Sequence, residues 1–241
     1  MDQSKQKPHI SVIIPAHNEE KYILKTLQSL ANQEYRHFEI IVVLSACSDR
    51  TELVVQRFIR LRPELQISLI IEQELGVSKA RNKGAKFAKG NLLFFLDADT
   101  FIDHNCLLKT NQYITSNYSI ATCHSKPIPW SIIFSLIVGL KNSAHRLGLV
   151  KGVHGNLICW RGHFEKVGGY NENLVVMEHR DLIYRLLKLG RYKWIPTAFC
   201  TTSMRRWEKE GVFKMLFYWF DQGVKSLFSK KRIAKQYEAI R

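Results

Sequence analysis

The chain has 241 residues, 46% of them hydrophobic, and this length suits one large domain or one domain with a tail. Lysine and arginine number 36 and aspartate and glutamate 21, so the formal charge of +15 predicts an anionic partner: a phosphorylated substrate, acidic lipid headgroups or nucleic acid. The five cysteines are odd in number, widely spaced and without a CxxC pair. This spacing argues against a disulfide framework or a zinc site and indicates reduced thiols of a cytosolic protein. Residues 1–8 lack the apolar run of a signal peptide, and the most apolar stretch, 130–140, is too short to span a bilayer.

Strand-like and helix-like stretches alternate through the first hundred residues. Continuous apolar runs predict strands at 9–16, 38–44, 67–71 and 92–96. Helical spacing and end signals predict helices over 18–32, 51–61 and 77–89, with Asn18 and Asp49 as N-caps of the first two and Gly90 as C-cap of the third. The short connections predict right-handed βαβ units and a mostly parallel sheet. No P-loop and no GxGxxG follows the first strand, which argues against an NTPase or a dinucleotide-dependent dehydrogenase.

The second half of the chain has a less regular pattern. It predicts helices over 106–117, 130–146 and 178–189, and strands over 119–124, 156–160 and 192–195, the last one stopped by Pro196. From Gly211 onward, apolar residues alternate with lysines and arginines, which is typical of a basic amphipathic helix.

Two carboxylates, Asp97 and Asp99, follow the apolar run 92–96 directly. Because an unpaired carboxylate is costly to bury, we place both at the carboxyl end of that strand, the edge where open α/β sheets bind ligands. Hard oxygen ligands suit Mg²⁺ or Mn²⁺, so the pair favours a divalent cation that holds a phosphorylated ligand. The alternative is an Asp-rich turn with no ligand.

Six segments in one order resemble family 2 glycosyltransferases of the GT-A fold. They are residues 13–20, 45–51, 81–84, 97–99, 164–170 and 178–187. The resemblance extends over residues 9–207 and implies an α/β fold with a Rossmann-like, mostly parallel sheet flanked by helices. It divides residues 1–207 into a donor half, about 9–100, and an acceptor half, about 101–207, and leaves 208–241 as a basic amphipathic helical extension.

The resemblance implies a site for a nucleoside-diphosphate sugar. Its implied donor-binding residues are Pro15, Ala16, His17, Glu19, Ser45, Arg81, Asp97, Asp99, Arg205 and Arg206. Within this set, the resemblance gives Asp99 to a Mg²⁺ or Mn²⁺ ion that bridges the two phosphates and Asp97 to the ribose side, with Asp97 as a second candidate metal ligand. Ser45 stands where the family usually has an aspartate that reads the base, so a uridine donor is favoured but not established.

The resemblance also implies the acceptor side and the general base. Family members usually carry Glu-Asp-x-Asp-Leu where this chain has Glu178-His179-Arg180-Asp181-Leu182, so the usual base position holds His179. We take Glu178 and His179 jointly as the catalytic base, with Asp181 as a further candidate that more plausibly caps or orients. Residues 203–207 resemble the Gln-x-x-Arg-Trp motif of processive members, with Ser203 in place of the glutamine. Arg205 and Arg206 would hold the diphosphate. Trp207, His154 and Gly155 are the expected acceptor contacts.

The expected activity is therefore metal-dependent transfer of one sugar, with inversion, to a hydroxyl of a lipid-linked or membrane-proximal glycan. The basic C-terminal stretch predicts contact with anionic lipid at the cytoplasmic face of the membrane. Alternatives are a relative that binds nucleotide sugars without transfer, a retaining transferase, and a nucleotidyltransferase. A nucleic-acid-binding module is disfavoured, because no helix-turn-helix or aromatic RNA-binding signature accompanies the positive charge.

Overall fold

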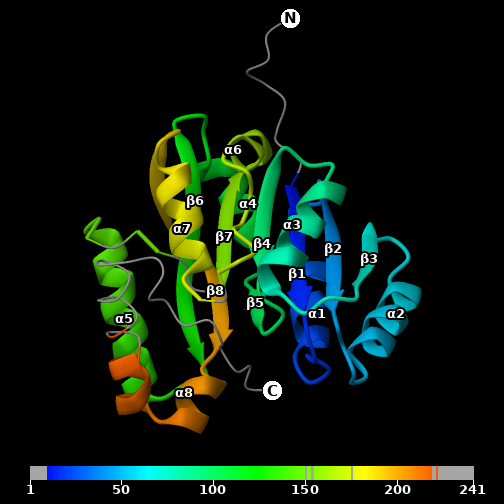
Figure 1. Cartoon of the computed structure of the whole chain (residues 1–241), viewed down its shortest axis with the longest axis horizontal. Coiled ribbons are helices and arrows are strands. Elements are labelled where there is room, and N and C mark those ends of the chain that lie inside the picture. The colour runs from blue at the N-terminus through cyan, green and yellow to red at the C-terminus, as the bar shows by residue number, and fades with distance from the viewer. Residues whose placement is uncertain (1–9, 150, 153–154, 175, 219–220, 222–241) are drawn as a thin grey trace, which may run out of the picture.

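The computed structural model describes residues 10–149, 151–152, 155–174, 176–218 and 221. One eight-stranded sheet runs through the molecule in the order β3-β2-β1-β4-β7-β6-β8-β5 (Figure 1). Its strands are β1 (Ile10–Ala16), β2 (Phe38–Ser45), β3 (Ile67–Glu72), β4 (Leu92–Leu96), β5 (Thr100–Ile102), β6 (Tyr118–Ile128), β7 (Asn156–Trp160) and β8 (Arg191–Ser203). The helices are α1 (Ile23–Ala31), α2 (Thr51–Leu61), α3 (Val77–Phe87), α4 (Cys106–Tyr113), α5 (Ile132–Arg146), α6 (Arg161–Lys166), α7 (Glu178–Leu186) and α8 (Arg205–Glu210).

The sheet is parallel from β3 to β4, as the βαβ pattern predicted, and mixed beyond β4. Strand β7 lies antiparallel to both β4 and β6, and β5 lies antiparallel to β8, whereas β6 and β8 are parallel. The prediction of a mostly parallel sheet therefore holds for the first half of the chain, and the two halves share one continuous sheet.

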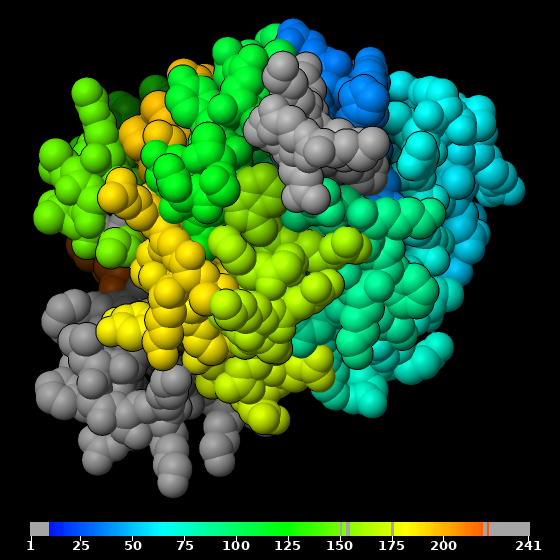
Figure 2. All heavy atoms as spheres, turned by 90° about the horizontal axis from the view of Figure 1, so that it is seen from above, coloured from blue at the N-terminus to red at the C-terminus, as the bar shows by residue number. Residues whose placement is uncertain are grey.

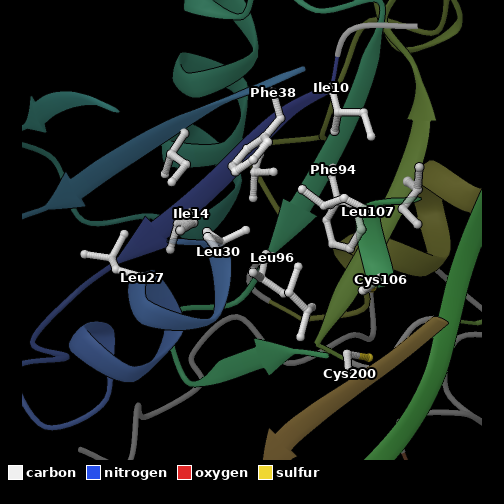
Figure 3. Close-up of a cluster of buried hydrophobic side chains, with 14 of the residues drawn as sticks. Ile10, Ile14, Leu27, Leu30, Phe38, Phe94, Leu96, Cys106, Leu107 and Cys200 are labelled. Carbon is white, nitrogen blue, oxygen red and sulfur yellow. The ribbon is translucent and has the colours of Figure 1, made fainter. Parts of the chain in front are cut away.

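Two apolar cores cover the two faces of the sheet. Alternate residues of β1, β2 and β4 point to one face, where they pack against α1, α2 and α4 (Figure 3). The intervening residues point to the other face and pack against α3, α6 and α7. This is why these strands read as continuous apolar runs. Gly84 lets α3 lie close to β1, since a Cβ there would lie 2.4 Å from Ile13 Cγ2.

Two predicted helix caps are wrong. Helix α1 begins at Ile23, and Asn18 instead has a positive φ of 54° and accepts a hydrogen bond from the Ser48 N–H through Oδ1 at 2.8 Å. Asn18 therefore joins the two loops that follow β1 and β2. Helix α3 ends at Phe87 with Ala88 as its C-cap, and the Gly90 N–H donates to Ser11 Oγ at 2.8 Å. The third predicted cap is wrong by one position: the N-cap of α2 is Arg50, and Asp49, one residue earlier, caps the helix through its side chain, since its Oδ1 accepts from the Thr51 N–H at 2.9 Å.

Strand β8 continues past Pro196, where the sequence predicted its end. The ladder with β6 pairs Cys123 with Ile195 and then His124 with Phe199, so residues 196–198 form a bulge. A bulge accommodates proline without the loss of a ladder hydrogen bond. The short elements β5, α6 and α8 were not predicted.

The predicted C-terminal helical extension lies mainly outside the described residues. Within it, residues 212–218 are helical, and the remainder of 219–241 is described only at Asp221. No helix in the described part of the chain is long and apolar enough to cross a membrane.

Candidate active site

A cleft of about 1600 Å³ opens at the carboxyl ends of β1, β2 and β4, and its other wall is formed by α5, α7 and α8. It brings together most of the residues that the sequence assigned to a site. Those that line it are Pro15, Ala16, His17, Glu19, Ser45, Arg81, Asp97, Asp99, Gly155, Glu178, His179, Arg205, Arg206 and Trp207. His154 lies outside the described residues.

Arg81 joins the two sides of the cleft. It is buried on α3, and its Nη2 donates to Asp97 Oδ1 at 2.8 Å while its Nη1 donates to Glu178 Oε1 at 3.0 Å. The guanidinium also lies 5.2 Å from the centre of the Tyr170 ring. Glu178 is 97 positions further along the chain, so the strand edge and the start of α7 are fixed to each other through one side chain.

A second arginine occupies the other side of the strand edge. Arg205, at the start of α8, donates to both carboxylate oxygens of the buried Glu19, at 2.8 and 2.7 Å, and its Nη2 lies 3.1 Å from Asp99 Oδ2. Its guanidinium lies 4.7 Å from the centre of the Tyr22 ring. Both arginines are therefore held rigidly at the floor of the cleft, where an anionic ligand would meet them.

The carboxylates of Asp97 and Glu19 lie near enough to Asp99 to act on its charge. Burial raises the pKa of Asp99 to about 7; Arg205 opposes this rise, and the nearby carboxylates of Asp97 and Glu19 add to it. A cation would relieve this repulsion, and carboxylate oxygens are ligands that Mg²⁺ and Mn²⁺ accept. Among the described residues no group of three or more His, Cys, Asp and Glu side chains surrounds a possible ion site. Asp99, with Asp97, would therefore hold the ion together with phosphate oxygens of a ligand.

The loop after β2 is shaped by Ser45 and His17. Ser45 Oγ donates to the Glu74 carbonyl at 2.8 Å and accepts from the Gly76 N–H at 3.0 Å. His17 Nδ1 lies 2.6 Å from the Ser45 carbonyl oxygen, to which it donates. The Ser45 hydroxyl thus fixes residues 74–76 at the rim of the cleft. Its contact with the base of a donor stays a prediction.

Glu178 and His179 lie together at the start of α7. His179 Nδ1 lies 3.0 Å from the hydroxyl of the buried Tyr170, and its Nε2 lies 3.8 Å from Glu178 Oε1. Burial, together with the cations Arg81 and Lys141, holds the pKa of His179 well below its ordinary value. The imidazole is therefore neutral at pH 7 and can accept a proton.

Asp181 has a structural role and is not placed as a base. It does not line the cleft, and its Oδ2 accepts from Arg185 Nε at 3.0 Å and Nη2 at 2.6 Å. Arg185 Nη1 in turn donates to the Val167 and Gly169 carbonyls at 2.6 and 2.7 Å. Asp181 therefore contacts Arg185, which binds the backbone of residues 167 and 169, and does not face the cleft.

The expected acceptor contacts are of two kinds. Gly155 acts through its backbone: its carbonyl accepts from the Asp97 N–H at 2.9 Å, its φ is 74°, and a Cβ there would lie 2.5 Å from Thr100 Oγ1. Trp207 presents its side chain to the cleft and packs against the apolar cluster of Phe134, Val138 and Met204. Gly155 therefore positions Asp97, and Trp207 remains the candidate acceptor platform.

Lys141 is a cleft residue that the sequence did not single out. It lies on the face of α5 that lines the cleft, and burial lowers its pKa to about 8. The sequence could have indicated it, because Lys141 is the one lysine in the apolar stretch that forms α5, and a cation on the buried side of such a helix needs a polar cavity.

The stability of the protein should depend on His179 in acid. Because the pKa of folded His179 lies below its ordinary value of 6.5, the unfolded chain binds the extra proton first, and stability falls as the pH drops below about 6.5. We expect His179→Gln to remove up to about 1.4 kcal/mol of this loss per pH unit. Urea unfolding of wild type and His179→Gln between pH 7.5 and 5.5 measures the free energy of unfolding. If it fell equally with pH in both proteins, the lowered pKa of His179 would be contradicted.

Comparison with known families identifies the chain. The family model described as glycosyl transferase family 2 matches residues 11–133, about half of the sequence. The chain belongs to glycosyl transferase family 2. Poly(ribitol-phosphate) beta-N-acetylglucosaminyltransferase TarS of Staphylococcus aureus is 34% identical over 111 residues, 45% of this chain and 19% of TarS. An uncharacterized glycosyltransferase of Haemophilus influenzae is 27% identical over 210 residues, 82% of this chain and 69% of that protein. The match to TarS thus spans about a fifth of that relative's length.

Solved structures of other glycosyltransferases share the fold. Mannosyltransferase PcManGT from Pyrobaculum calidifontis, in complex with GDP-Man and Mn²⁺, matches with a TM-score of 0.68 at 22% identity over 82% of this chain and 57% of that one. S. aureus TarS 1–349 in complex with UDP-GlcNAc matches with a TM-score of 0.64 at 21% identity over 80% of this chain and 58% of that one. These likenesses confirm the predicted GT-A fold.

Proposed function

We propose that this protein transfers a single sugar from a nucleoside-diphosphate sugar to a hydroxyl group, with a divalent cation as cofactor. The observation that carries the proposal is the link through Arg81, which holds Asp97 at the strand edge and Glu178 at the start of α7 in one cleft. A carboxylate pair for a metal-bound diphosphate and a candidate base on the facing wall are the two components that sugar transfer requires.

Several features support a diphosphate donor. Arg205 is fixed beside Asp99, and Arg206 lines the same cleft. Both arginines can stabilise the negative charge that develops on a leaving diphosphate. The bound cation would supply Lewis-acid stabilisation of the same charge. The structural neighbours are complexes with GDP-Man and Mn²⁺ and with UDP-GlcNAc, which supports a donor of this class without fixing its base or sugar.

On the acceptor side, we propose that Glu178 and His179 act together as the base. As an acceptor oxygen attacks the anomeric carbon, its proton passes to this pair, and the bond from the anomeric carbon to the diphosphate oxygen breaks. Attack opposite the leaving group inverts the anomeric centre. Tyr170 holds the imidazole of His179, and Arg81 holds the carboxylate of Glu178, so neither side chain needs to reorganise.

We further propose that the acceptor is a glycan or polyol chain of the cell envelope, lipid-linked or close to a membrane. The support comes from relatives: TarS is named for poly(ribitol-phosphate), and TuaG of Bacillus subtilis, 33% identical over 93 residues, is named as a putative teichuronic acid biosynthesis glycosyltransferase. The charge of +15 agrees with an anionic acceptor or surface.

Donor cleavage tests the proposal and separates it from its main alternative, a relative that binds a nucleotide sugar without transfer. We expect wild-type protein with Mn²⁺ to release nucleoside diphosphate slowly from one of a panel of UDP- and GDP-sugars, with water as acceptor. Asp99→Asn should lower this rate by about 10³-fold. A donor that binds but is cleaved no faster by wild type than by Asp99→Asn would favour the silent relative. Once an acceptor is known, the anomeric configuration of the product separates inversion from retention.

A further inference from the structure

One face of α5 is apolar and exposed to solvent. Ile132, Ile133, Leu136 and Leu140 follow one side of the helix at helical spacing. Each of the four exposes between 57% and 76% of its surface, and no part of the described chain covers them. Soluble proteins rarely leave so many large aliphatic side chains together on one face, so this face indicates an interaction surface.

The helical residues 212–218 next to α5 also expose large apolar side chains. Val212 packs against the cluster of Phe134 and Val138 on α5, which places this short segment beside α5. Phe213 and Phe217 nevertheless expose 88% and 75% of their surfaces. We call Ile132, Ile133, Leu136, Leu140, Phe213 and Phe217 the α5 patch.

The opposite face of α5 lines the active-site cleft. Ile137, Val138 and Lys141 contribute to the wall of the cleft, and so does Met215 from the segment 212–218. Asn142 fixes the helix to β6, since its Nδ2 donates to the Ser125 carbonyl at 2.8 Å and its Oδ1 accepts from the Ser125 N–H at 3.2 Å. A partner on the α5 patch would therefore lie about one helix diameter from the cleft.

The charge around the patch selects the kind of partner. Arg146 lies in the last turn of α5, and residues 130–151 contain no aspartate or glutamate. A second copy would bring the same positive charge and a net +15 against it, whereas an anionic surface is attracted. Apolar side chains beside cations are typical of segments that bind at the lipid–water interface.

We propose that the α5 patch docks the protein onto the surface of an anionic lipid bilayer. The docked protein holds the wall of its cleft against the membrane, so an acceptor anchored in the same membrane can reach Trp207 and the Glu178–His179 pair. This inference specifies the membrane-proximal acceptor of the proposed function, but the docking itself requires neither donor nor catalysis.

Vesicle flotation of the full chain, without donor or metal, tests the docking. We expect binding to vesicles of equal phosphatidylglycerol and phosphatidylcholine and weak binding to phosphatidylcholine alone. Ile133→Ser, Leu136→Ser and Leu140→Ser combined should lower the binding by about tenfold or more. Leu136→Glu alone, which adds one repelling charge at an exposed position, should lower the binding several-fold and serves if the triple variant folds poorly.

The matched control replaces exposed leucines of α2, Leu53→Ser and Leu61→Ser, because α2 and α5 lie at opposite sides of the molecule (Figures 1 and 2). This variant should bind like wild type.

Equal binding by the patch variant and wild type, or equal losses in patch and control variants, would overturn the proposal. So would a wild type that ignores both vesicles; a dimer that the patch substitutions dissolve, seen by sedimentation velocity, would then assign the patch to a second copy. Donor cleavage is measured separately, so failure of docking leaves the proposed function standing, and the converse holds too.

Discussion

Replacing Arg81 with methionine should lower the free energy of unfolding by about 3 kcal/mol. The Arg81 side chain is 3% exposed and its guanidinium is the partner of both Asp97 and Glu178, whereas methionine offers an unbranched apolar side chain without the charge. Both carboxylates would then face each other across the cleft without their cation, and the cost of leaving buried charge unpaired exceeds the value of the pair itself. We expect the lower end of the usual range, since Asp97 is partly exposed.

Lys83→Met is the matched control for Arg81→Met. Lys83 lies on the same helix, pairs with Glu72 at 2.9 Å and remains partly in water, so its removal should change stability far less. Urea unfolding of wild type and the two variants at pH 7.5 measures both effects. Equal losses in the two variants would show that Arg81 is an ordinary surface partner and would remove the link between the donor and acceptor sides. Arg81→Lys should recover only part of the loss, because an ammonium group cannot contact both carboxylates as the guanidinium fork does.

The largest effect on catalysis is expected at Glu178 and His179. We expect Glu178→Gln and His179→Ala each to lower the rate of donor cleavage by about 10² to 10⁴-fold, with donor affinity changed only a few-fold. Because Glu178 Oε1 and His179 Nε2 lie 3.8 Å apart and the two side chains act on one proton, the double variant should lose little more than either single variant.

Asp181→Asn is the control for the assignment of the base. Asp181 lies one turn along the same helix but pairs with Arg185, so its substitution should reduce stability and leave donor cleavage by the folded protein within a few-fold of wild type. If Asp181→Asn lost activity as Glu178→Gln does, or if the effects of the Glu178 and His179 substitutions were simply additive, the base would have to be reassigned.

The strand edge was predictable because its physical causes are local. Leu92–Leu96 is apolar on both faces because both faces are buried, and carboxylates directly after such a run can lie only at its end. The predictions that rested on tertiary context were less reliable. Asn18 is a good helix N-cap by type, yet it binds the backbone of a loop 30 residues away. Pro196 stops an isolated strand, but here it lies in a bulge.

The partners within the cleft could not be predicted for the same reason. Arg81 was expected to reach a nucleotide. No local pattern indicates that its guanidinium Nη1 donates to Glu178, 97 positions later in the chain. Helix α5 carries Lys141 on the side that lines the cleft and large apolar residues on its exposed side. Because both sides carry aliphatic residues, the sequence pattern did not show which side is buried. The family resemblance supplied the order of the motifs, and the structure adds how they are connected.

Thermal unfolding with nucleotides tests the central claim most directly. Wild type and Asp99→Asn are melted with UDP, GDP and their sugar conjugates, each with and without Mn²⁺. A ligand present at 100 times its Kd stabilises the folded state by about 2.7 kcal/mol, which a melting curve resolves. We predict that one nucleotide raises the melting temperature of wild type only with Mn²⁺ and that Asp99→Asn abolishes this shift. A wild type that no nucleotide stabilises, with or without Mn²⁺, would contradict the donor site described for this cleft.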